Sequence, residues 1–451
     1  MKDNIKKVIK LISNSAILSI GSIIVAVSLF LYKVIFYQES PASYSEFLLA
    51  YSVYLFYRII GFMDVGNPLS NDVNKFKENY EDQDSKYLGS AFNLVLAFSL
   101  FSNLIMIVNL FLIEINWRII LIFCFAMFSE NINNVIITYF RGLEKVTSSS
   151  ILLSIKGASK PLLLFIYSFL FEINSLSLTA VLLVAELFAL IVSFVAFLIY
   201  YRKNKLGFNI IKADKRQFII YILQCLTLMI ISLTIQGFRS SMYMFIDHYL
   251  SSENLGFLDV PITLQLFLLT FFINIGLMLT VNNEDFKEKR KFLKFIGFIF
   301  LTCTLLVILY EIIAYFITTD DLILEYVFNL EGMQLAEGVM LLLPSVPFFV
   351  IFYITSGYKQ GSRKYLGLTL MALISLIISI LPAYFLIRHL GLTGAFIAQI
   401  IYSIILAALS IVIIVTDKID TYLEILYKKI KIFILNKINH KNKDDLSNIE
   451  I

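Results

Sequence analysis

Residues 11–37 read LISNSAILSIGSIIVAVSLFLYKVIFY, an apolar run in which Lys33 is the only charged side chain. A helix of about 20 apolar residues is long enough to cross the hydrocarbon core of a bilayer. The run is too long for the core of a signal peptide, and no small-residue cleavage site follows it. We therefore expect a retained first membrane span.

Similar runs recur along the whole chain. Its 451 residues are 59% hydrophobic and only 16% charged, with a mean hydropathy of +0.82, a balance that no soluble domain of this length has. The sequence predicts an all-α integral membrane protein with twelve spans in two pseudo-symmetric six-helix bundles. The predicted spans are 11–37, 44–68, 87–113, 117–140, 150–171, 176–201, 217–246, 255–280, 292–317, 334–356, 365–388 and 392–416.

The connecting segments alternate between basic and nearly uncharged. Basic segments stay in the cytoplasm during insertion, which predicts a multi-pass protein of the plasma membrane with both termini cytoplasmic. The tail carries apolar residues at helical spacing between lysines, typical either of an amphipathic helix on the inner leaflet or of a solvated charged tail. The predicted organisation is a basic N-terminus at 1–10, bundles at 11–201 and 217–416, a basic linker at 202–216 and the tail at 417–451.

Two stretches in the two halves resemble each other. PASYSEFLLAYSVYLFYRIIG (41–61) and SSENLGFLDVPITLQLFLLTF (251–271) both lead from a short polar loop through an aromatic and small-residue turn into an apolar helix. Halves that begin on the same side of the membrane imply parallel repeats, and transporters built in this way bind their substrate between the halves.

No sequence pattern indicates catalysis. The chain has no phosphate-binding glycine loop ending in Lys-Ser/Thr, no HExxH and no GxSxG. Cys124, Cys225 and Cys303 lie in apolar runs without ligand spacing, so we expect neither a disulfide nor a metal site. We expect no enzyme, no catalytic residue, no cofactor and no nucleic-acid partner.

Arg58 lies near mid-depth of the second span. An ionised side chain at the bilayer centre costs about 2.5–3.5 kcal/mol even on lenient insertion scales. Tyr51 and Tyr54 share its helix face, and tyrosines beside a guanidinium suit a sugar ring next to a phosphate. The alternative is an ion pair between Arg58 and an acid that only packs the bundle.

The seventh span carries a polar stripe at helical spacing. Gln236, Arg239 and Tyr243 lie on it between Ser232 and Asp247. Such a stripe faces water or another helix rather than lipid, although Arg239 could instead extend to the membrane surface.

Three lysines complete the predicted binding set. Lys156 and Lys160 share a helix face before Pro161 and either guide a phosphate or face the cytoplasm. Lys33 is near the end of the first span, where it binds substrate or reaches the surface.

Four acids are candidates for ion coupling or ion pairing. Glu130 shares a face with Asn133 and Asn134, and Glu186 and Asp259 lie in the sixth and eighth spans. Asp64, at the end of the second span, is more typical of a helix terminus.

Three stretches together resemble the polysaccharide and O-antigen flippases of the multidrug/oligosaccharidyl-lipid/polysaccharide exporter superfamily. They are YSEFLLAYSVYLFYRIIGFMDVGN (44–67), IDHYLSSENLGFLDVPITL (246–264) and GLTGAFIAQIIYSII (391–405). Their order matches the family along nearly the whole chain. Asp259 and Pro261 depart from the small residues that the family has at the start of the eighth span.

The resemblance implies transport of an undecaprenyl-pyrophosphate-linked oligosaccharide from the inner to the outer leaflet, for O-antigen, lipopolysaccharide or other surface polysaccharide biosynthesis. It implies a central cavity lined with cations, which Arg58 and Arg239 match in placement. The implied partners are the lipid-linked oligosaccharide, the bilayer, the polymerase of the same pathway and a coupling ion, H⁺ or Na⁺.

Two other functions remain open. A multidrug or ion-coupled exporter of the same fold would have an acid-dominated cavity, because its substrates are usually cationic. A membrane polysaccharide polymerase or ligase would need a sizeable outer loop, which is lacking among the predicted connections.

Overall fold

The computed structural model describes residues 13–28, 41–76, 81–203, 215–250, 254–281, 289–318, 332–362, 364–416 and 425. These residues form helices and short turns, and no strand occurs among them. After an apolar helix at Ser13–Ser28, the elements are α2 (Pro41–Phe62), α3 (Gly66–Phe76), α4 (Glu81–Leu112), α5 (Trp117–Gly142), α6 (Val146–Ser168), α7 (Ser175–Lys203), α8 (Lys215–Tyr249), α9 (Asn254–Val281), α10 (Lys289–Thr318), α12 (Gly332–Leu342), η2 (Leu343–Ser345), α13 (Val346–Gly361) and α14 (Leu366–Val415).

The helices agree with the twelve predicted spans. Ten helices in the described part of the chain are long and apolar enough to cross a membrane, and Ser13–Ser28 belongs to the first predicted span. The longest, α14, is two helices joined at Gly391, whose φ of 63° is a left-handed conformation that glycine adopts without strain. Gly391 falls between the predicted spans 365–388 and 392–416, so two helices are present where two spans are predicted.

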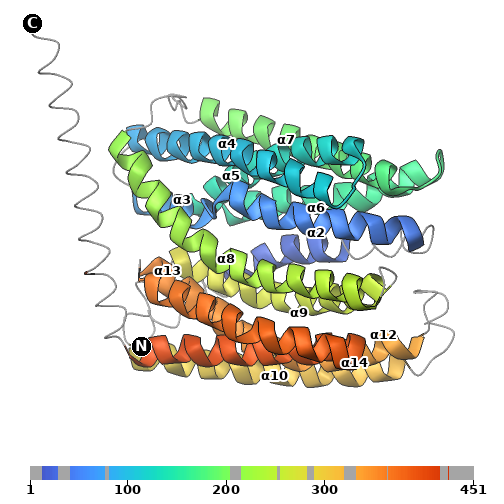
Figure 1. The fold of residues 1–451 in the computed structure, drawn as a ribbon. Helices are drawn as coiled ribbons and strands as arrows, with labels where there is room; N and C mark the ends of the chain where they lie inside the picture. The colour runs from blue at the N-terminus through green and yellow to red at the C-terminus, as the bar shows by residue number, and fades with distance from the viewer. Residues whose placement is uncertain are drawn as a thin grey trace, which may run out of the picture.

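The helices form two bundles. In Figure 1 the helices α2 to α7 lie above and α8 to α14 lie below, with α2 and α8 facing each other across the middle. Within the first bundle α5 packs against α3, α4, α6 and α7, and within the second α8 packs on α14 and α9 on α13. The two-bundle architecture is confirmed, whereas the exact domain boundaries stay predictions.

Helix α4 shows an apolar outer face and small polar residues toward its neighbours, as expected of a helix that borders lipid. On α4, Leu100, Leu104 and Val108 recur every four residues and are more than half exposed. On its opposite face Ser99 and Ser102 are fully buried, and Ser102 donates to the backbone carbonyl of Tyr57 on α2. Small polar residues let helices approach and hydrogen-bond where no hydrophobic force drives them together.

The end of α2 has an unusual backbone. Met63 and Asp64 have φ angles of 51° and 50°, in the left-handed region that few non-glycine residues adopt. The Asp64 carboxylate accepts a 3.1 Å hydrogen bond from the Asn67 side chain at the start of α3. Asp64 therefore stabilises the turn between the two helices.

Several predicted features lie outside the described residues. They are Lys33, the basic N-terminus 1–10, most of the linker 202–216 and the tail 417–451 apart from Ile425.

Candidate functional site

A cavity of about 290 Å³ lies between the two bundles. Its walls come from the helix Ser13–Ser28 and from α2, α5, α6, α8 and α9, so both halves contribute. The polar and aromatic side chains that line it are Tyr51, Ser52, Arg58, Glu130, Lys156, Lys160, Gln236, Arg239, Tyr243, Asp259 and Thr263.

Four cations predicted from the sequence converge on this cavity. Arg58, Lys156 and Lys160 come from the first half and Arg239 comes from the second. They lie on three different helices, so only the packing of α2, α6 and α8 brings them together. The cavity is lined by two carboxylates against these four cations, and its wall is therefore net positive.

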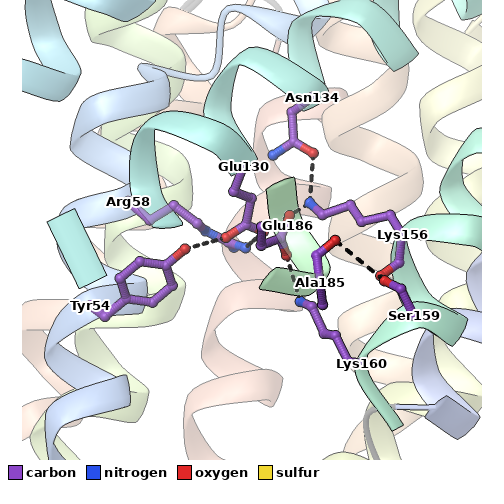
Figure 2. A network of polar contacts seen from close by, with 9 residues as sticks. All are labelled: Tyr54, Arg58, Glu130, Asn134, Lys156, Ser159, Lys160, Ala185 and Glu186. Atoms are coloured by element: carbon purple, nitrogen blue, oxygen red, sulfur yellow. Dashed lines mark hydrogen bonds and ion pairs between the residues drawn. The ribbon is translucent and has the colours of Figure 1, made fainter. Parts of the chain in front are cut away.

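Glu130 on α5 is the centre of a polar network in the first half (Figure 2). Its Oε1 accepts hydrogen bonds from Arg58 Nη1 at 2.5 Å and from Lys156 Nζ at 2.9 Å. Its Oε2 accepts a 2.5 Å hydrogen bond from the Tyr54 hydroxyl. The Lys156 ammonium also donates to Asn134 Oδ1 at 2.8 Å.

A second ion pair lies beside this network. Lys160 Nζ on α6 is 2.8 Å from Glu186 Oε1 on α7. The Glu186 side chain is fully buried and does not line the cavity. This pair leaves Lys160 at the cavity wall with its charge compensated from behind.

The exposure of these groups sets the charge that a ligand would meet. The Arg58 side chain is 30% exposed, whereas the Glu130 side chain is 4% exposed. The carboxylate lies deep in the bundle, and the guanidinium faces the cavity.

Arg239 differs from the other three cations. Its Nε and Nη2 atoms are buried and have no hydrogen-bond partner among the described residues. A buried donor without an acceptor carries its full desolvation cost. Because Arg239 also lines the cavity, an anion bound there would supply these donors with an acceptor once the side chain turns toward it.

Asp259 links the two halves at one end of the cavity. One carboxylate oxygen accepts from the hydroxyl of Tyr44 on α2 at 2.9 Å, and the other accepts from the hydroxyl of Tyr243 on α8 at 2.5 Å. Tyr44 and Asp259 are both buried. We call Tyr44, Tyr243 and Asp259 the tyrosine–aspartate latch.

Sequence reasoning missed Tyr44, although it lies in the first of the two similar stretches and Asp259 lies in the second. The latch thus joins corresponding segments of the two halves. Asp259 had been considered as an ion-pair or coupling candidate, and its contacts in the latch are with tyrosine hydroxyls.

The remaining predicted residues lie in different places. Tyr51, Gln236 and Tyr243 line the cavity. Tyr54 is fully buried beside Tyr51 and Phe123, with ring centroids 5.6 and 4.9 Å away, and does not line it. The Tyr54 ring is therefore not available to stack on a sugar, and its hydroxyl holds Glu130 instead.

Asp64 lies away from this cavity. Its Oδ2 accepts a 3.3 Å hydrogen bond from Ser232 on α8, a second link between the halves. It lines a separate cavity of about 330 Å³ together with Arg141. Among the described residues, no group of three or more His, Cys, Asp and Glu side chains could hold a metal ion.

No protein-family model matches the chain, and no curated protein matches it. Solved structures do. The chain is 15% identical to a multidrug resistance MATE family transporter of the MOP superfamily in an outward-facing conformation, with a TM-score of 0.68 over 92% of this chain and 96% of that one. It is 15% identical to the eukaryotic MATE transporter AtDTX14, with a TM-score of 0.70 over 91% and 96%. A MATE structure in a bent conformation matches at 15% identity with a TM-score of 0.69 over 94% and 96%.

These matches define the class of the protein by its architecture. It is a multi-pass helical membrane protein with the two-bundle fold of MATE transporters. At this level of identity the likeness shows the fold alone, and the cargo has to be argued from the cavity.

Proposed function

We propose that the protein is a secondary transporter whose cargo binds in the cavity between the two bundles and crosses by alternating access. Two facts support this: a cavity walled by both halves, and a latch that joins the halves at one end of it. A cavity between two bundles becomes accessible from opposite sides when the bundles rock against each other.

We infer that the cargo is an anion attached to a lipid, of the kind implied by the flippase resemblance: an undecaprenyl-pyrophosphate-linked oligosaccharide. The observation that carries this is the set of cations on the cavity wall: Arg239, which has no ion pair among the described residues, together with Arg58 and Lys156. Moving a bare pyrophosphate through hydrocarbon is prohibitive, because an ion loses its hydration there without compensation. Arginine binds phosphate oxygens through paired N–H donors and offsets that loss.

The second candidate is a multidrug exporter, and the comparisons with solved structures favour it, since one neighbour is described as a multidrug resistance transporter. A cationic drug would bind a cavity carboxylate. Glu130 and Asp259 are both buried, and both already accept hydrogen bonds from the protein. The cavity charge therefore favours an anion, whereas the fold neighbours favour a drug.

The proposed direction of transport rests on the charge of the loops and on the flippase resemblance. We infer from the basic segments that both termini are cytoplasmic. The flippase resemblance implies transport from the inner to the outer leaflet. Such a protein would supply lipid-linked units to the polymerase of surface polysaccharide assembly.

Binding of two probes to the purified full-length protein tests the cargo class. We expect undecaprenyl pyrophosphate to bind and tetraphenylphosphonium, a lipophilic cation, not to bind. Arg239→Ala should weaken binding of the pyrophosphate lipid about 10- to 100-fold, the loss of one charge-assisted contact. Arg118→Ala is the matched control, because Arg118 lies exposed at the start of α5 against Trp117, far from the cavity wall.

The opposite pattern would establish the multidrug exporter. Binding of the lipophilic cation, and no binding of the pyrophosphate lipid, would overturn the anionic cargo. Cells in which the gene is deleted should accumulate lipid-linked repeat units on the inner face of the membrane.

A further inference from the structure

The two halves present their arginines to the cavity in different states. Arg58 is bound to Glu130, and so is Lys156, while Arg239 has two donors without a partner. An anion that enters the cavity can bind Arg239 without displacing a carboxylate. To bind Arg58 or Lys156 it must compete with a carboxylate that is already there.

The two oxygens of Glu130 have different tasks. Oε2 accepts from Tyr54, whose hydroxyl is fully enclosed between α2 and α5. Oε1 accepts from both cavity-facing cations, Arg58 and Lys156. Both cations could therefore leave together while the carboxylate keeps one hydrogen bond and stays in place.

We propose that Glu130 is a built-in competitor for the anionic group of the cargo. It occupies Arg58 and Lys156 while the cavity is empty, so that the cargo binds Arg239 first and then draws these two cations away from Glu130. The inference rests on the proposed anionic cargo and adds a residue that sets how tightly, and in what order, that cargo is held.

The physical reason for such a competitor is that the cargo has to be released after it has crossed. A doubly charged group held by four unopposed cations in a medium of low dielectric constant would bind very tightly, and a transporter must let its cargo go. A resident carboxylate lowers the net gain on binding, because each contact of the cargo with Arg58 or Lys156 replaces one that the cation already had. It also draws the cations back when the cargo leaves.

The neighbouring ion pair does not serve the same purpose. Glu186 is fully buried behind Lys160 and does not reach the cavity, so it compensates charge without competing at the wall. Asp259 does reach the cavity, but its carboxylate accepts hydrogen bonds from Tyr44 and Tyr243, whereas Arg58 and Lys156 are paired with Glu130.

Binding of undecaprenyl pyrophosphate, without a sugar, to the purified full-length protein tests this. Glu130→Gln removes the competing charge and keeps an oxygen for Tyr54. We expect it to bind the probe about tenfold more tightly than wild type and to transport it more slowly in proteoliposomes, because release is impaired. Glu130→Asp keeps the charge and should bind much as wild type does.

Glu46→Gln is the matched control for net charge. It removes one exposed carboxylate on α2, which accepts a hydrogen bond from Ser175 and does not line the cavity, so its affinity for the probe should stay within about threefold of wild type. An equal gain in both variants would show that only the overall charge of the protein matters and would overturn the inference.

A second measurement does not depend on the Glu130 variants. Because Arg239 binds first and has no competitor, Arg239→Ala should cost more affinity than Arg58→Ala, by about tenfold. An equal or larger loss in Arg58→Ala would overturn the inference, as would a Glu130→Gln protein that binds the probe no more tightly than wild type. A wild-type protein that does not bind the probe at all would instead overturn the proposed anionic cargo, and this inference with it.

Discussion

Arg58 and Arg239 carry the same guanidinium group to the same cavity but differ in what surrounds them. The Glu130 carboxylate on the neighbouring helix α5 compensates Arg58, and the described residues offer Arg239 no acceptor for two of its nitrogens. A paired arginine in a membrane bundle can be explained by packing alone. An arginine with buried, unsatisfied donors is better explained by a ligand that supplies the acceptor, because the unpaired state costs stability.

Lys160 and Glu186 provide a prediction about stability at the scale of single residues. Glu186→Gln leaves the Lys160 ammonium without a counter-charge in the bundle, which should lower the free energy of unfolding by about 3 kcal/mol. The double variant Lys160→Met, Glu186→Gln removes both charges and should recover most of the loss. Thermal unfolding of the purified protein measures both, and a single variant as stable as wild type would contradict the account of a buried ion pair.

At the scale of the helices, close packing depends on a few small residues. Gly276 on α9 and Gly357 on α13 lie back to back, and a Cβ atom built on Gly357 would lie far inside contact distance of the Gly276 carbonyl. The positions of a Cβ atom and of a backbone carbonyl are both fixed by the main chain, so no side-chain rotation can relieve this clash. These two helices can pack in this way only with glycine at position 357.

Gly357→Ala should therefore force α9 and α13 apart and lower the free energy of unfolding by about 1–3 kcal/mol. Gly297→Ala is the matched control on α10, where a Cβ atom would meet nothing within 4 Å. The control should be unchanged or slightly stabilised, since alanine favours helix by up to about 1 kcal/mol. Melting temperatures of the two variants compare the effects directly; equal values would show that the close approach is not required.

For the whole molecule, the tyrosine–aspartate latch makes one conformation more stable than others. Tyr44 comes from the first bundle and Asp259 from the second, so their hydrogen bond forms only while that end of the cavity is closed. A hydrogen bond to a charged group contributes about 1.5–3 kcal/mol. Its loss would shift a two-state equilibrium by a factor of about 10 or more.

Tyr44→Phe should thus increase the fraction of molecules open at the end where α2 begins. A cysteine introduced at Leu48, which lines the cavity near Tyr44, should react several-fold faster with a membrane-impermeant thiol reagent added from that side. Tyr57→Phe is the control, because it removes a hydroxyl that accepts a 2.6 Å hydrogen bond from Asn109 Nδ2 within a single bundle. Equal labelling rates in the two variants would show that the latch does not hold the halves together.

The membrane architecture can be predicted from the amino-acid sequence alone. The number of long apolar runs predicts the number of spans, because a bilayer requires an apolar helix of nearly fixed length at each crossing. The repeat of polar turn and apolar helix indicated two halves, and Gly391 separates the last two spans as the pattern predicted. Intramembrane charges such as Arg58 and Arg239 were also visible, because charge is so costly in lipid that few residues carry it there.

Which charged side chains pair with each other depends on how the helices pack, and that is visible in the folded structure alone. Glu130 was a candidate for ion pairing among several acids, and nothing in its spacing showed that Arg58, Lys156 and Tyr54 share its two oxygens. Tyr54 shares a helix face with Arg58, yet its ring is buried, because α5 covers that part of the face with Phe123. Partners on different helices are set by how the bundles pack, and helix periodicity specifies the face of a residue but not the neighbour that the face will meet.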